Sequence, residues 1–71
     1  MTSRAWYEVW VDECHDIPVV LLLRPAGDGF EVLDPGQGNR RIFAAAEYDQ
    51  VRFWLSEDEF VLAARKELEE P

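Results

Sequence analysis

The sequence contains few cations, a single cysteine and no long apolar run, and each scarcity excludes a class of function. Seven Lys and Arg stand against fifteen Asp and Glu, which gives a formal net charge of −8. Binding to nucleic acids or to anionic membrane surfaces depends on clustered cations, so we expect neither partner. The longest purely aliphatic run, 19–23, is far short of the ~20 residues that span a bilayer.

Cys14 is the only cysteine, so no disulfide can form within the chain. Small secreted domains usually depend on disulfides, and their absence favours a cytoplasmic location. The same scarcity limits metal chemistry. The segment 12–16 contains Cys14 and His15, but no second cysteine or histidine exists to complete a zinc site. We therefore expect no metal and no other cofactor.

The chain does contain enough apolar material for one small domain. Its 71 residues are 48% hydrophobic and 13% aromatic, which predicts a packed core and not a disordered chain. No repeat, low-complexity segment or linker interrupts the pattern. Residues 1–71 are therefore expected to form a single domain.

The most informative stretch is Ala5–Asp12, which is apolar on both faces when extended. Side chains alternate along a strand, so Tyr7 points one way while Trp6, Glu8 and Trp10 point the other. The Tyr7 side is typical of a core stripe. The tryptophan side is predicted to be an exposed contact face, because a short chain has little material to cover both sides of a sheet. The alternative is that a curled sheet or the last segment of the chain covers it.

The rest of the chain predicts a small antiparallel meander of about four strands with a helix packed on one face, an α+β fold. A turn at 25–29 contains two glycines and joins two strands, and a second turn-rich loop follows at 34–39. Apolar residues at spacings of three and four then indicate a helix. The expected strands after the first are 19–24, 30–33 and 40–44, and the expected helix is 46–55.

The end of the chain has two readings. The segment 56–59 is Ser-Glu-Asp-Glu, a capping box that predicts the start of a second helix, and the Ala- and Glu-rich sequence after it favours the same structure. Alternating apolar residues from Phe60 onward predict instead a C-terminal strand, which would pair with a sheet edge. Both readings stay open at this point.

Four short motifs give the chain a resemblance to a group of short uncharacterised bacterial proteins. They are the Trp/Tyr-rich stretch 6–11, Leu-Leu-Leu-Arg-Pro at 21–25, Glu-Val-Leu-Asp-Pro at 31–35 and Trp-Leu-Ser-Glu-Asp-Glu at 54–59. The resemblance implies no activity. It implies a strand after the last motif.

No residues in the sequence form a catalytic set. Cys14 and His15 are adjacent and tend to point apart, and no third group is placed to orient them. We therefore expect a protein that is not an enzyme and has no catalytic residues. Arg40 and Arg41 form a rare basic pair in an acidic chain, which favours a role in orienting a partner.

The sequence therefore predicts a non-enzymatic protein-interaction module that acts as a homodimer or as a small accessory or regulatory subunit. The alternative is an acidic decoy or inhibitor that occupies a basic site on a protein partner. The residues predicted to contact the partner are Trp6, Glu8, Trp10, Arg40 and Arg41.

Overall fold

The computed structural model describes residues 5–14 and 16–68, which form an α+β fold as predicted. One strand more than the predicted four is present, because the end of the chain is extended. In chain order the elements are β1 (Ala5–Asp12), β2 (Val19–Ala26), β3 (Gly29–Asp34), the 3-10 turn η1 (Pro35–Gln37), β4 (Arg40–Ala45), α1 (Tyr48–Glu57) and β5 (Val61–Leu68). No helix in this described part is long and apolar enough to cross a membrane.

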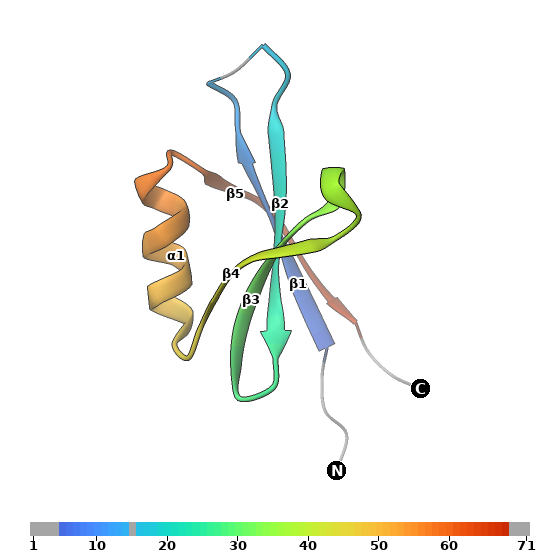
Figure 1. The fold of residues 1–71 in the computed structure, drawn as a ribbon, viewed down its shortest axis with the longest axis vertical. Helices are drawn as coiled ribbons and strands as arrows, with labels where there is room; N and C mark the ends of the chain where they lie inside the picture. Colours follow the sequence, from blue (N-terminus) through green and yellow to red (C-terminus); the bar gives the residue numbers. More distant parts are fainter. Residues whose placement is uncertain (1–4, 15, 69–71) are drawn as a thin grey trace.

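The five strands form one antiparallel sheet in the order β4-β3-β2-β1-β5. Figure 1 shows a strongly twisted sheet with α1 packed to one side of it. The last strand returns beside the first, so that Leu68 lies opposite Ala5. This pairing places β1 inside the sheet, with a hydrogen-bonded neighbour on each of its two edges.

The hairpin between β2 and β3 sets the register of the middle of the sheet. Its loop is Gly27–Asp28, with Ala26 opposite Gly29. Gly27 has φ of +59°, which suits the first position of a type II′ turn, where glycine is preferred. A Cβ atom on Gly29 would lie 2.4 Å from the carbonyl oxygen of Ala45, so glycine also allows β3 to approach β4.

Helix α1 covers one face of the sheet and forms the core with it. Val51 and Leu55 on the helix are completely buried against strand residues that include Leu23 and Val32. This confirms the predicted helical stripe. The helix begins at Tyr48, two residues later than predicted, after a capping box formed by the side chains and backbone of residues 47 and 50.

The capping box predicted at 56–59 is wrong, because this segment ends a helix. Helix α1 stops at Glu57, and Glu59 adopts a left-handed φ of +64° that turns the chain. Phe60 is then buried in the core, and β5 begins at the next residue. The C-terminal strand, and not a second helix, is therefore the correct reading.

A bulge in β4 changes which of its side chains share a face. Arg41 lies opposite Leu33 and Phe43 lies opposite Val32, so the extra residue Ile42 sends Arg41 and Phe43 to opposite sides. Regular alternation along a strand would place these two residues on the same side. Phe43 instead packs in the core, where its ring stacks on Trp54 at a centroid distance of 4.4 Å.

Candidate functional site

The face of β1 that carries Trp6 and Trp10 is the core face, which corrects the prediction that it is exposed. Trp10 is 3% exposed and Glu8 is 1% exposed beneath α1, and Trp6 packs against the same core. The large aromatic side chains have the most apolar area to bury, so they take the side that the helix covers. Trp10 and Glu8 therefore cannot touch a partner while the domain is folded.

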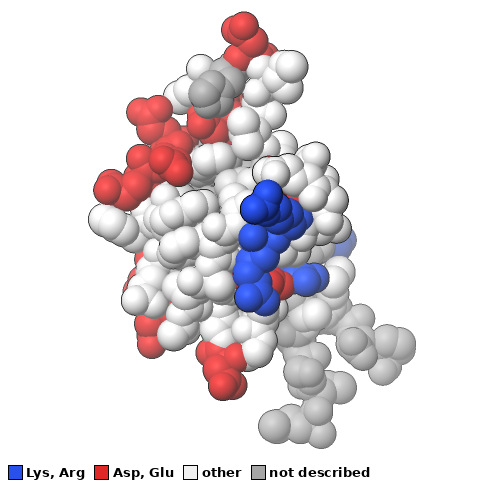
Figure 2. All heavy atoms as spheres, viewed as in Figure 1, with Lys and Arg blue, Asp and Glu red and all other residues white. Residues whose placement is uncertain are grey.

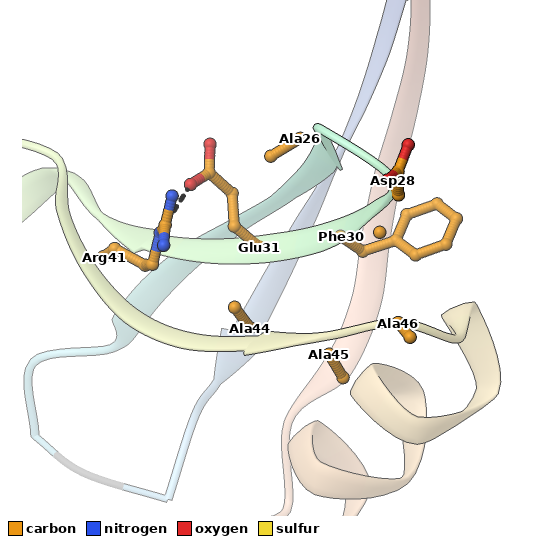
Figure 3. Close-up of a pocket in the computed structure, with 9 residues that line it drawn as sticks. Ala26, Asp28, Phe30, Glu31, Arg41, Ala44, Ala45 and Ala46 are labelled. Carbon is orange, nitrogen blue, oxygen red and sulfur yellow. Dashed lines mark hydrogen bonds and ion pairs between the residues drawn. The ribbon is translucent and has the colours of Figure 1, made fainter.

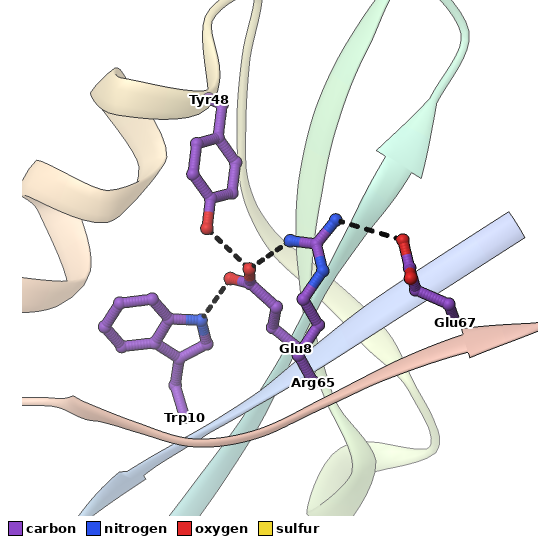
Figure 4. A network of polar contacts seen from close by, with 5 residues as sticks. All are labelled: Glu8, Trp10, Tyr48, Arg65 and Glu67. Atoms are coloured by element: carbon purple, nitrogen blue, oxygen red, sulfur yellow. Dashed lines mark hydrogen bonds and ion pairs between the residues drawn. The ribbon is translucent and has the colours of Figure 1, made fainter.

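The Glu8 carboxylate is buried because three donors from different elements satisfy it. Oε1 accepts a hydrogen bond from the Trp10 indole at 3.0 Å, and Oε2 accepts bonds from the Tyr48 hydroxyl at 2.5 Å and from Arg65 Nη1 at 2.7 Å. Figure 4 shows these side chains converging from β1, α1 and β5. The network joins the helix and the last strand to the first strand.

Aromatic rings close the space around this carboxylate. The guanidinium carbon of Arg65 lies 4.2 Å from the centroid of the Trp6 ring, which adds a cation–π contact. Trp6, Phe30 and Tyr48 pack as a triangle with centroid distances between 5.7 and 6.0 Å. Glu8 is buried among these side chains, and its hydrogen bonds tie β1, α1 and β5 together.

Among the described residues no α-helix packs on the other side of the sheet, and we call this side the open face. Residues directly opposite each other on antiparallel strands share a face, so the strand pairings identify its members. They are Ala5, Tyr7, Val9, Val11, Val20, Leu22, Arg24, Ala26, Glu31, Leu33, Arg41, Ala44, Val61, Ala64, Lys66 and Leu68. Val20 is 40% exposed and Val61 is 57% exposed, so apolar area on this face meets solvent.

A second buried carboxylate, Glu31, lies on the open face between two arginines. Arg24 Nε donates to Glu31 Oε2 at 2.6 Å, and Arg41 Nε donates to Oε1 at 2.9 Å. Figure 3 shows the contact between Glu31 and Arg41. The hydrogen bond from Arg24, aided by Arg41, lowers the pKa of Glu31 although burial opposes this effect. The carboxylate is therefore charged, and the group of three carries a net charge of about +1 at neutral pH.

Charges of opposite sign occupy different parts of the surface. Figure 2 shows a stripe of Lys and Arg atoms over the sheet, whereas Asp and Glu atoms lie along the helix side and at the top and bottom of the view. Arg24, Arg41 and Lys66 lie on the open face, and Glu31 is the one acid among its members. A protein with a net charge of −8 therefore presents a locally basic face.

The far end of the molecule contains an acidic hollow of about 470 Å³ beside Cys14, lined also by Asp12 and by the acids at 57–59. The Cys14 thiol donates a hydrogen bond to Glu59 Oε2 at 3.3 Å. This bond and the charge of Glu59, with a smaller effect from Asp12, raise the pKa of Cys14 to about 11. The thiol is thus protonated at neutral pH and is a poor nucleophile. His15 lies outside the described residues.

The residues predicted to meet a partner are therefore divided between the two faces. Arg41 lies on the open face. Arg40, the first residue of β4, lies opposite Asp34 in the strand register and is exposed. Sequence reasoning missed Arg24 and Glu31, although a signal was present. Both lie three residues from the two-residue hairpin loop, a spacing that places opposite charges across from each other on neighbouring strands.

Comparison of the chain with models of protein families, with curated protein sequences and with solved structures gives no match. The resemblance to short bacterial proteins remains a prediction.

Proposed function

We propose that the protein is a non-enzymatic interaction module that binds a protein partner through the open face. The observation that carries this proposal is a sheet face with exposed valines, including Val20 and Val61, beside three cations in an otherwise acidic molecule. Uncovered apolar area bordered by polar groups is typical of interaction surfaces. The predicted partner surface thus moves from the tryptophan side of β1 to the opposite side.

The charges of the open face favour a partner different from the protein itself. A symmetric dimer through this face would place Arg24, Arg41 and Lys66 of both copies in one interface. Like charges brought together in this way oppose association. A small accessory subunit of a heteromeric complex therefore fits better than a homodimer. A cytoplasmic location accords with this function, since Cys14 is an exposed free thiol.

The proposal is tested by placing one acid on each side of the molecule. Val61 on the open face and Phe53 on the outer surface of α1 are 57% and 67% exposed, so Val61→Glu and Phe53→Glu introduce the same charge at an exposed apolar position. Each variant and the native protein are used to capture proteins from a lysate of the source organism. A captured protein is then purified, and its affinity is measured by calorimetry.

We expect Val61→Glu to weaken binding by at least about tenfold, because it places a carboxylate without a partner in an apolar contact. Phe53→Glu is expected to bind as the native protein does. Val20→Glu, elsewhere on the open face, should repeat the loss. Capture that is equal for all variants, together with a monomer in sedimentation velocity, would exclude the open face as an interface.

The acidic end of the molecule favours a second candidate, an acidic decoy that occupies a basic site. Its basis is the hollow of about 470 Å³ lined by Asp12 and the acids at 57–59. A partner held there by charge would still bind Val61→Glu and would be released by salt, because exposed charges are strongly screened. The same capture experiment therefore separates the two candidates.

A further inference from the structure

We infer that Arg24 and Arg41 form a carboxylate-binding pair that recognises an acidic, extended segment of a partner protein. The inference rests on the proposed function and names the chemical group that the open face recognises. Glu31 is a positioning residue in this site, because it fixes the two guanidinium groups. The ligand is an Asp or Glu side chain with apolar neighbours.

Glu31 holds both arginines by one edge and leaves their other nitrogens available. Each guanidinium uses its Nε on the carboxylate, and the two side chains remain 54% and 62% exposed. Within residues 5–14 and 16–68, the hydrogen bonds of both guanidinium groups are made through Nε, and no hydrogen bond is found at their Nη atoms. A guanidinium offers donors in a planar fork that matches a carboxylate, so each arginine can still bind a second acid.

Preorganisation makes this pair different from two ordinary surface arginines. The side chain of Glu31 is only 6% exposed, and its two oxygens are each occupied by one arginine. The long side chains are therefore already ordered before a ligand arrives, which lowers the entropic cost of binding. An incoming carboxylate also meets a site with a net charge of about +1, since two cations flank one anion.

Two apolar hollows flank the pair, and Glu31 lines both. One, of about 320 Å³, is lined by Arg41, Phe30 and the alanines at 44–46, with Asp28 as a second acid (Figure 3). The other, of about 370 Å³, is lined by Arg24, Tyr7 and Leu68 among others. Side chains two residues apart lie on the same side of an extended segment. A segment with an acid between two apolar residues at that spacing therefore fits the pair and its hollows.

The test uses a defined peptide and does not depend on identifying the partner. The probe is the blocked peptide Ser-Leu-Ser-Glu-Ser-Leu-Ser, with a copy that has Gln in place of Glu and with acetate as small-anion control. Binding is followed by NMR on 15N-labelled protein, through the side-chain Nε–Hε signals of arginine and the backbone amides of β2, β3 and β4. We expect the Glu peptide to shift the Arg24 and Arg41 signals and the Gln peptide to leave them unmoved.

The decisive variant is Arg24→Lys/Arg41→Lys. A lysine keeps the charge and can still pair with Glu31, but it has no second nitrogen to offer. We expect this variant to bind the Glu peptide at least about tenfold more weakly, as for the loss of a charged hydrogen bond. Arg52→Lys, on α1, is the matched control and should bind normally. If the double variant does not fold, the comparison of the two peptides on the native protein remains a complete test.

Three results would overturn the inference. They are equal shifts from the Glu and Gln peptides, equal shifts from acetate and the Glu peptide, and unchanged binding to the double lysine variant. These failures are distinct from failure of the proposed function. A partner that is lost on Val61→Glu but kept by the double lysine variant retains the open face as an interface and removes only the arginine pair. If the peptide binds but no partner depends on Val61, the arginine pair is retained as a carboxylate site and the open face is removed as the partner interface.

Discussion

Glu8 is a buried charge whose environment explains why the fold tolerates it. Its two oxygens accept three hydrogen bonds, and one donor, Arg65, also supplies the opposite charge. A buried carboxylate without such partners would destabilise the domain by several kcal/mol. Within the described residues, no buried side-chain nitrogen or oxygen lacks a hydrogen-bond partner. Removing any one donor should therefore cost stability.

The Tyr48 hydroxyl is the donor whose removal gives the clearest prediction. Tyr48→Phe deletes only the hydroxyl that bonds to Glu8, and we expect a loss of about 1.5–3 kcal/mol in the free energy of unfolding at pH 7. Urea unfolding measures this loss. Tyr7→Phe on the open face is the control, and it should change stability by less than about 0.5 kcal/mol. Equal losses in the two variants would show that Glu8 gains little from Tyr48.

The same residue makes stability fall in alkali. Burial, followed by the hydrogen bond and charge of Glu8, raises the pKa of Tyr48 from 10.0 to about 12. The folded state thus holds this proton more tightly than the unfolded state does. Its contribution is complete below pH 10 and is lost as the pH rises from 10 to about 12. In the Tyr48→Phe protein this part of the alkaline loss should disappear.

The sequence predicted the alternation of residues in β1 but not which side is the core. The reason is that two of the groups that hydrogen-bond to Glu8, on Tyr48 and Arg65, lie 40 and 57 positions later in the chain. Short-range pattern cannot anticipate them, so a strand side with a carboxylate between two tryptophans resembled a surface. The pair of Arg24 and Glu31 differs, because a two-residue hairpin loop fixes its register locally.

At the scale of elements, β5 shows how tertiary contacts override local propensity. Its sequence, Val-Leu-Ala-Ala-Arg-Lys-Glu-Leu, has six residues of high helix propensity after Val-Leu, yet it is extended and pairs with β1 from Ala5 to Val11. The pairing gives β1 a second neighbour and brings Arg65 to Glu8. The alternating apolar residues after Phe60 carried the correct signal, and the capping box before them did not.

Strand alternation in β5 gives a prediction for two adjacent cations. Arg65 points to the core side and bonds to Glu8, whereas Lys66 lies opposite Tyr7 on the open face. We expect Arg65→Ala to reduce the free energy of unfolding by about 1.5–3 kcal/mol, since a buried carboxylate loses a charged donor. Lys66→Ala should change it by less than about 0.5 kcal/mol. Denaturant unfolding of both variants is the measurement, and losses of equal size would contradict the alternation.

For the molecule as a whole, the separation of charges is the property that composition could not reveal. The net charge of −8 excludes a generally basic surface, yet the topology gathers three of the seven Lys and Arg on one face. The same topology brings the end of α1 next to the end of β1, where acids from both meet. Sequence alone predicted an acidic protein with an α+β fold. The assignment of charge to faces required the register of all five strands.

The acids at the C-terminal end of α1 interact unfavourably with the helix dipole, which is negative at that end. This effect on stability can be tested. Glu57 is the last residue of the helix, and no basic residue lies in its last turn. We expect Glu57→Lys to stabilise the domain by about 0.3–1 kcal/mol at low ionic strength, because a cation favours a helix C-terminus and the neighbouring acids repel one another less. Asp49→Lys is the control with the same change of charge at the favourable, N-terminal end of the helix, and it should destabilise the domain.

Thermal and urea unfolding of both variants in about 10 mM and about 1 M NaCl completes this test. The Debye length falls from about 30 Å to about 3 Å between these conditions, so both effects should shrink in high salt. Stabilisation by both variants would mean that net charge alone matters. Opposite signs that converge in high salt would show that the position of the charge along α1 matters. The acids at the C-terminal end of α1 would then be shown to lower the stability of the fold through their position at the helix dipole.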